Sequence, residues 1–429
     1  VSPTRLLAGE ILVEQAGAAR IAVHRAPDLP QRPEPAEAPE AEPFSLPEPP
    51  TLPESLPRIT VERLFADRIE LGEALIGEAA VFNLEGHATT GPTGRAAEAR
   101  LDLVRIDQPT ASLGLGATLD LDADRIGVDL QGSETGGLMA ALTGREDAGD
   151  LSLTLAGDGP LDDWQAELQF AIERLVTANA DLALAYAANP SVDLALRVVP
   201  VGGALPPEIE AVLGQRLELA LAGGQRAPGH FALDRLTLNS GLVTASGTLE
   251  ARLDEDRLTG RISVTAADLA RASALAGQPL AGRMDLTLDA LGSFSEPRFT
   301  LALDGDGITA DTFGVGDLAL DMTADLLGPL DQPFAGVRLE GSGQVMDLTQ
   351  NGEPLRPESG VTLDLAAIVP MEGEARLERF SLAGQHVSVN GTAIVTMPEI
   401  AGTGRLEARV PSVEDLLAAL GPAAPTDLA

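Results

Sequence analysis

Apolar and polar residues alternate with a period of two along most of the chain from Ile59 onward. Clear examples are Leu151-Ser152-Leu153-Thr154-Leu155 and Leu168-Gln169-Phe170-Ala171-Ile172. Side chains of a β-strand point alternately to its two faces, so each segment buries one face and exposes the other to water. Turn residues such as Gly157-Asp158-Gly159-Pro160 and Asn351-Gly352 separate these segments. The pattern predicts a mainly all-β fold built from short antiparallel strands.

A few segments break the alternation and predict short helices. Candidates lie near 134–143, 206–213, 267–276 and 412–420. Proline or acidic residues open two of them, at Pro206-Pro207-Glu208 and at Pro411-Ser412 with Glu414-Asp415. Each candidate ends at a glycine, the usual residue just past a helix end.

The composition of the chain changes along its length and suggests five segments. Residues 1–25 predict two short strands, and 26–58 form a spacer rich in Pro and Glu. Proline removes a backbone donor and fixes φ, so neither helix nor sheet is expected to continue through the spacer. Residues 59–232 form a β-repeat region with short helices near 134–143 and 206–213, 233–376 form a repeat unit, and 377–429 begin a further, truncated unit.

The last two segments repeat each other. Residues 233–269 align without gaps onto 377–413, and a looser third copy lies at 103–144. Leu233-Asp234-Arg235-Leu236 matches Leu377-Glu378-Arg379-Phe380, and Gly260-Arg261 matches Gly404-Arg405. Repeats that each hold several strands and one short helix predict stacked units that share a continuous core.

The composition excludes several classes of function. Aromatic residues make up only 3% of a chain that is 44% hydrophobic, whereas a compact enzyme core would carry more of them. The formal net charge is -36, so nucleic acid is not an expected partner, and the acidity is interpreted as an aid to solubility. There are no cysteines and no apolar run of the ~20 residues that would span a bilayer.

No residue pattern indicates catalysis, a metal or a cofactor. The 4 histidines, His24, His87, His230 and His386, show no metal-ligand spacing. Two acidic groups, Asp120/Asp122/Asp124 and Asp304/Asp306/Asp311, have calcium-like spacing but are interpreted as a strand face and a turn. We therefore expect a protein that is not an enzyme and has no cofactor, and we interpret the lone Trp164 as a residue that plugs a turn.

The order of motifs near the start of the chain resembles a known family. Leu6-Leu7-Ala8-Gly9 and His24-Arg25 precede the spacer, and Val61-Glu62-Arg63-Leu64 and Ile69-Glu70-Leu71-Gly72 follow it. Later interruptions of the apolar–polar alternation, such as Leu291-Gly292-Ser293-Phe294, fit the repeat pattern of the same family. These residues resemble the TamB group of the AsmA-like family, and the resemblance extends over the whole chain.

The resemblance implies a long, curved, β-taco-like sheet with an apolar groove and a few short helices. It also implies a periplasmic location in a Gram-negative bacterium, phospholipid transport between the membranes, and support of outer-membrane protein assembly. The implied partners are phospholipid, the inner membrane through an anchor expected upstream of this fragment, and an outer-membrane barrel of the TamA/Omp85 type. That barrel would be met through a C-terminal domain that we do not recognise in this chain.

Ten residues are the expected lining of this groove. They are Leu151, Leu153, Leu155, Leu168, Phe170, Ile172, Leu286, Leu288, Leu301 and Leu303. Two other hypotheses remain open from the sequence. One is a structural or adhesive β-repeat with a closed core and no lipid, and the other is a chaperone-like surface that pairs with strand edges of client proteins.

Overall fold

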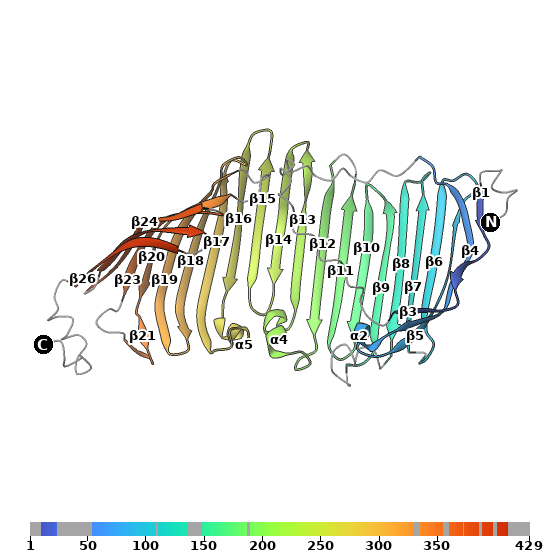
Figure 1. Cartoon of the computed structure of the whole chain (residues 1–429), viewed down its shortest axis with the longest axis horizontal. Coiled ribbons are helices and arrows are strands. Elements are labelled where there is room, and N and C mark those ends of the chain that lie inside the picture. The colour runs from blue at the N-terminus through green and yellow to red at the C-terminus, as the bar shows by residue number, and fades with distance from the viewer. Residues whose placement is uncertain are drawn as a thin grey trace. The chain divides into compact units, whose positions relative to one another are not determined.

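The computed structural model describes residues 10–23, 54–108, 110–135, 148–186, 189–328, 335–354, 360–371, 373–385, 388–397 and 401–410. These residues form 26 strands and a few short helices, which confirms the predicted, mainly all-β fold (Figure 1). They divide into two compact units, and the division falls inside one strand, at Gly224 and Gln225.

In unit 1, ten strands pair in chain order, each antiparallel to the next, from β4 to β13. The ten strands are β4 (Arg58–Leu71), β5 (Ala80–Thr90), β6 (Ala96–Arg105), β7 (Ala111–Asp120), β8 (Arg125–Glu134), β9 (Leu151–Pro160), β10 (Trp164–Ile172), β11 (Val176–Ala185), β12 (Ser191–Pro200) and β13 (Leu217–Ala227). Most are connected by tight turns, so neighbours in sequence are neighbours in the ladder (Figure 1).

Three short strands depart from the predicted antiparallel arrangement. β1 (Glu10–Val13), β2 (Ala16–Ala18) and β3 (Ile21–Val23) all pair in parallel with β4. Parallel neighbours need a connection of a dozen residues or more, and residues 24–57 supply that length. The three strands cover the edge of β4 that β5 leaves open.

Unit 2 is a second antiparallel ladder. Its pairs run from β14 (His230–Asn239) through β15 (Thr244–Arg252), β16 (Arg257–Ala266), β17 (Leu280–Gly292), β18 (Pro297–Ala310) and β19 (Phe313–Leu326). They continue through β20 (Gly336–Met346), β23 (Val361–Pro370), β24 (Gly373–Gly384), β25 (Ser388–Met397) and β26 (Ala401–Arg409). The small strands β21 (Thr349–Gln350) and β22 (Glu353–Pro354) extend from one end of β19.

The short helices agree in part with the prediction. α4 (Pro207–Leu213) occupies the second candidate segment, while η1 (Leu269–Ala272) and α5 (Ser273–Ala276) occupy the third. Gly277 follows α5 in the left-handed conformation expected of a terminating glycine. A fourth helix, α2 (Glu73–Ile76), was not predicted. The candidate at 412–420 lies outside the described residues, as do most of 134–143 and most of the spacer at 26–58.

The two aligned copies in unit 2 have the same strand registers. Leu236 lies opposite Gly247 in the first copy, and Phe380 lies opposite Gly391 in the second. The register shifts by one residue between Leu233 and Leu236, and again between Leu377 and Phe380. Such a shift is a β-bulge, in which one strand carries an extra residue. The two copies therefore share not only their sequence pattern but also a β-bulge at the equivalent position.

Candidate functional site: the apolar face of the sheet

The ten expected groove residues come together as five cross-strand pairs. In each hairpin the paired residues lie on one face of the sheet, because alternate side chains point the same way. The pairs are Leu151–Ile172, Leu153–Phe170 and Leu155–Leu168 between β9 and β10, and Leu286–Leu303 and Leu288–Leu301 between β17 and β18.

Each set of pairs belongs to a longer apolar row that crosses its own unit. In unit 1 one row contains Leu101, Leu115, Leu130, Leu155, Leu168, Ala180, Leu196 and Leu219. In unit 2 a row contains Leu238, Ala245, Val264, Leu286, Leu303, Leu320, Gly343, Leu363, Leu382 and Val389. We call the surface that carries these rows the apolar face of each unit.

Glycines interrupt the apolar rows, and aliphatic side chains from adjacent strands lie against them. A Cβ atom at Gly132 would lie 3.2 Å from Leu113 Cδ1 and 3.4 Å from Leu153 Cβ. A Cβ atom at Gly341 would lie 2.8 Å from Met322 Cγ. Large side chains thus occupy the space left by small ones, and the apolar face stays continuous without aromatic residues.

The apolar face of unit 1 is partly open to solvent. Leu113 is 39% exposed and Leu115 is 38% exposed, although both lie in the middle of the ladder. In each unit, extensive contacts between described elements join ladder neighbours or the short helices beside β17. Neither unit shows a second layer of described strands packed on these rows.

One end of the apolar face in unit 1 is closed. Ala148, Ile172, Leu175 and Ala204 form a buried cluster, which we call the closing cluster. Ala148 and Ala204 come from the connections before β9 and after β12. Leu151, Phe170, Val176 and Leu205 pack against the cluster. The connections therefore fold over the strand ends at this side of the apolar face.

A buried arginine lies at the same end of β6. Arg105 is fully buried, lies opposite Phe82, and follows Leu101 and Leu103 on the apolar side of the strand. Its Nε donates to Asp107 Oδ1 at 3.0 Å and its Nη1 donates to Glu78 Oε1 at 2.5 Å. Hydrogen bonds to Asp107 and Glu78 raise the pKa of Arg105 against the effect of its burial, and the two carboxylates pair with the buried charge.

Trp164 lies at the opposite end of the apolar face. Its ring covers Gly157, where a Cβ atom would lie 2.3 Å from Trp164 Cζ2. The indole Nε1 donates to the carbonyl oxygen of Ile126 at 3.1 Å. The expectation that Gly157–Pro160 form a turn plugged by Trp164 is wrong, because these four residues belong to β9. The ring instead lies over Gly157 and extends the apolar surface from β10 onto β9.

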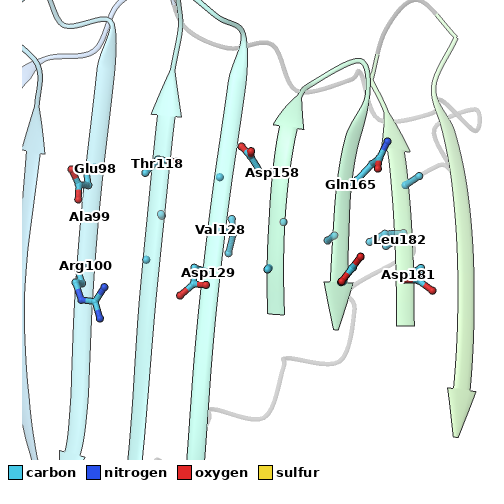
Figure 2. Close-up of a pocket in the computed structure, with 18 of the residues that line it drawn as sticks. Glu98, Ala99, Arg100, Thr118, Val128, Asp129, Asp158, Gln165, Asp181 and Leu182 are labelled. Atoms are coloured by element: carbon cyan, nitrogen blue, oxygen red, sulfur yellow. The ribbon is translucent and has the colours of Figure 1, made fainter. Parts of the chain in front are cut away.

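The opposite face of the sheet is polar and acidic. A hollow of about 920 Å³ lies on it in unit 1, and Figure 2 shows side chains from several adjacent strands around it. Its lining includes six carboxylates and one guanidinium, namely Glu98, Asp129, Asp158, Glu167, Asp181, Asp193 and Arg100. A smaller hollow in unit 2, lined by residues such as Asp321, Glu340 and Arg379, lies on the same polar side of its ladder.

Ion pairs stabilise this polar face locally. Arg125 Nε donates to Asp158 Oδ1 at 2.9 Å, and Nη2 donates to Oδ2. These hydrogen bonds and the positive charge of Arg125 lower the pKa of Asp158. Both side chains are more than half exposed, so the pair contributes little to stability.

The acidic residues with calcium-like spacing lie partly in turns and partly in strands. Asp122 and Asp124 lie in the turn after β7, so the interpretation as a strand face is wrong for them. Asp304 and Asp306 belong to β18, so the interpretation as a turn is wrong for these two. Asp120 Oδ1 accepts hydrogen bonds from the backbone N–H groups of Asp122 and Ala123. Asp122 also pairs with Arg95. Asp124 and Asp311 have φ angles of 51° and 53°, the left-handed conformation that Asp tolerates in turns. The described residues contain no cluster of His, Asp or Glu suited to a metal ion.

Comparisons with known proteins identify no relative. Searches of protein-family models, curated proteins and solved structures return no match. The TamB-like and AsmA-like resemblance therefore stays an expectation from sequence motifs. The described residues also contain no helix that is long and apolar enough to cross a membrane.

The two rows named above consist of aliphatic residues and glycine, whereas the row through Leu151 and Ile172 also contains Glu134, which is buried opposite Leu151. Attraction of an aliphatic row to hydrocarbon requires only apolar surface and exclusion of water. Three features were not predicted from the sequence: the closing cluster, the buried Arg105 and the hollow on the polar face. The sequence did contain a signal for Arg105, because it follows Leu101 and Leu103 at a spacing of two and so belongs to the same face of the strand.

Proposed function

We propose that this chain is a non-catalytic periplasmic scaffold that holds phospholipid acyl chains on its apolar face. In this proposal it serves lipid transport between the inner and outer membranes and supports outer-membrane protein assembly. An inner-membrane anchor and a barrel partner of the TamA/Omp85 type would act through parts of the protein outside the described residues.

The observation that carries the proposal is the partly open aliphatic row in the middle of unit 1. Leu113 and Leu115 would lose unfavourable contact with water if hydrocarbon covered them. Burial stabilises hydrocarbon by about 0.8 kcal/mol per CH₂. A tail that buries ten methylenes gains on the order of 8 kcal/mol before the costs of association. Because this attraction is not directional, a lipid can also move from one position to the next.

Photocrosslinking tests the proposal directly. A photoreactive residue replaces Leu153, Phe170, Leu286 or Leu301 one at a time, and mass spectrometry identifies lipid adducts after irradiation in cells. Matched controls are Thr154, Gln169, Thr287 and Ala302, which follow or precede these positions and pair with each other across the same hairpins. We expect phospholipid adducts at the first set and few at the second.

The same experiment separates the proposal from its alternatives. Absence of lipid at all four apolar positions would leave a structural or adhesive repeat with a closed face. Equal labelling of both sets would indicate nonspecific contact with membranes. Adducts of unfolded outer-membrane proteins along strand edges, without lipid, would instead favour the chaperone-like function.

A further inference from the structure

The two ends of the apolar face in unit 1 differ in chemistry. At one end the closing cluster buries Ile172 and Leu175 to 7% and 3% exposure. At the other end lies Trp164, which begins β10, whereas Ile172 ends it. The two residues are separated by about 26 Å along the strand, at ~3.3 Å per residue. The tails of one leaflet reach across half of the ~30 Å hydrocarbon thickness of a bilayer. The distance along the strand is longer than that reach, so a tail fits between the two ends.

The end of the apolar face at Trp164, which we call the Trp164 end, carries the two aromatic residues suited to a boundary between hydrocarbon and water. The chain has one Trp and one Tyr, and both belong to this end. Trp164 lies opposite Leu184 in the ladder, and Tyr186 comes two residues after Leu184. The backbone N–H of Tyr186 donates to the carbonyl oxygen of Leu161 at 2.8 Å, and its side chain is exposed. Tyr and Trp are enriched where one end of the ring is apolar and the other is wet.

The charges at the Trp164 end are predominantly negative. Asp124 and the pair Asp162–Asp163 lie in two hairpin turns that are joined by a hydrogen bond from Leu161 N to Asp124 O at 3.0 Å. None of the three takes part in an ion pair with another described residue, while nearby Arg125 is already paired with Asp158. An anionic headgroup would be repelled at this end, whereas a zwitterionic headgroup would not.

We propose that unit 1 binds a zwitterionic phospholipid with its tails along the strands, the tail ends toward the closing cluster and the headgroup at the Trp164 end. The inference rests on the proposed lipid-binding function and adds the orientation of the lipid and the class of headgroup. Orientation follows from the buried cluster at one end and the amphipathic aromatics at the other. Headgroup class follows from the carboxylates of the two turns, whose negative charges are not balanced by an ion pair with another described residue.

Bromine quenching of tryptophan fluorescence tests the orientation, because Trp164 is the one tryptophan of the chain. The purified full chain is mixed with phosphatidylcholine vesicles brominated near the carboxyl end or near the methyl end of the acyl chains. We expect a larger loss of Trp164 fluorescence with the first lipid. A second protein, Trp164→Phe with Phe170→Trp, places the reporter next to the closing cluster. There we expect a larger loss with the second lipid.

The outcomes distinguish the two proposals. Equal quenching by both lipids at both reporters, or a reversed order, would overturn the orientation and leave lipid binding intact. No quenching at either reporter would overturn lipid binding by this unit. Urea unfolding of the double variant checks that it folds. If it does not, Leu153→Trp in the Trp164→Phe background gives a second reporter, because Leu153 lies opposite Phe170.

Headgroup class is tested with the same reporter. Brominated phosphatidylglycerol replaces phosphatidylcholine at low ionic strength, and we expect weaker quenching that recovers as salt screens the carboxylates. Asp162→Asn with Asp163→Asn should reduce the difference between the two lipids. Equal quenching by both headgroups at low salt would overturn the headgroup preference, and the orientation would stand on its own result.

Discussion

Two regions of unit 2, β14–β16 and β24–β26, have matching sequences and registers but different surroundings. Ile262 in β16 lies between Gly247 of β15 and Leu288 of β17. Its equivalent in β26, Leu406, faces Gly391 of β25 and is 71% exposed. The alternating pattern therefore determines register and facing, whereas burial depends on the next strand in the ladder.

The space around equivalent glycines of the two copies also depends on whether a further strand follows in the ladder. A Cβ atom at Gly247 would lie 2.8 Å from the carbonyl oxygen of Arg261 and 2.9 Å from Ile262 Cγ1. At Gly391 the corresponding distances to Arg405 O and Leu406 Cδ1 are both 3.2 Å. The approach is looser in the second copy, whose outer strand has no described neighbour beyond it.

The largest expected effect on stability comes from deleting one residue of a strand, in either copy, so that the apolar–polar alternation shifts by one position. Deletion of Thr237 or Ser381 makes two apolar residues adjacent, so one part of the strand turns to the wrong face. We expect each deletion to lower the free energy of unfolding by about 4 kcal/mol or more, measured by urea denaturation. Deletion of Arg235 or Glu378, inside the bulges, should cost about 1 kcal/mol or less, because regular alternation is restored. Equal losses for both kinds of deletion would show that the bulges themselves are required.

An intermediate effect should separate the two copies. Ile262→Ala removes contacts with residues of two neighbouring strands, and we expect a loss of about 2 kcal/mol in the free energy of unfolding. Leu406→Ala removes an exposed side chain, and we expect a change within about 0.5 kcal/mol. Urea denaturation of both variants measures the contrast. A similar loss at Leu406 would mean that this face is covered in solution.

The smallest effect concerns the polar face and depends on pH. Arg261 donates to Asp289 through Nε at 2.5 Å and Nη2 at 3.0 Å, and these bonds lower the pKa of Asp289. A carboxyl with a lowered pKa stabilises the fold above its ordinary pKa, and this contribution is lost as pH falls through the folded pKa.

The matched variants are Arg261→Ala and Arg405→Ala, since Arg405 has no ion pair with another described residue. The difference in unfolding midpoint between wild type and Arg261→Ala should be present at pH 7 and should vanish as pH falls through the folded pKa of Asp289, which lies below the ordinary value for Asp. Arg405→Ala should show no such pH-dependent difference. A difference for Arg261→Ala that persists in acid would assign the effect to packing of the arginine stem.

Strand facing was predictable because the period-two pattern is strong. Thr154 and Gln169 were expected to face away from Leu153 and Phe170, and the two polar residues pair with each other on the opposite face. Such predictions hold within a hairpin because a tight turn preserves the phase of both strands. They need no knowledge of distant parts of the chain.

The bulges were not predicted, although the sequence carries a signal for them. In six places two apolar residues are separated by an acidic residue and an arginine. Two of these, Ala123-Asp124-Arg125-Ile126 and Ile172-Glu173-Arg174-Leu175, fall at hairpin turns, and in the other four the register shifts within a strand. These four are Val61-Glu62-Arg63-Leu64, Ala66-Asp67-Arg68-Ile69, Leu233-Asp234-Arg235-Leu236 and Leu377-Glu378-Arg379-Phe380. A spacing of three cannot place both apolar residues on one face of a regular strand, so an extra residue is inserted.

Other features depend on distant contacts and left no local signal. The parallel pairing of β1–β3 with β4 requires knowledge of where residues 24–57 return. The closing cluster joins connections before β9 and after β12, which are remote in sequence. The helix α2 has only four residues, too few for a helical periodicity to stand out.

The connectivity of unit 1 has a consequence for the order of folding during synthesis. From β4 to β12, each strand finds its partner as soon as the next one leaves the ribosome, because pairing is with the neighbour in sequence. The first three strands are the exception. They are synthesised before β4, which emerges only after residues 24–57 have been added. β1–β3 must therefore wait for their partner strand, and their docking onto β4 closes a loop much longer than the turns of the later hairpins.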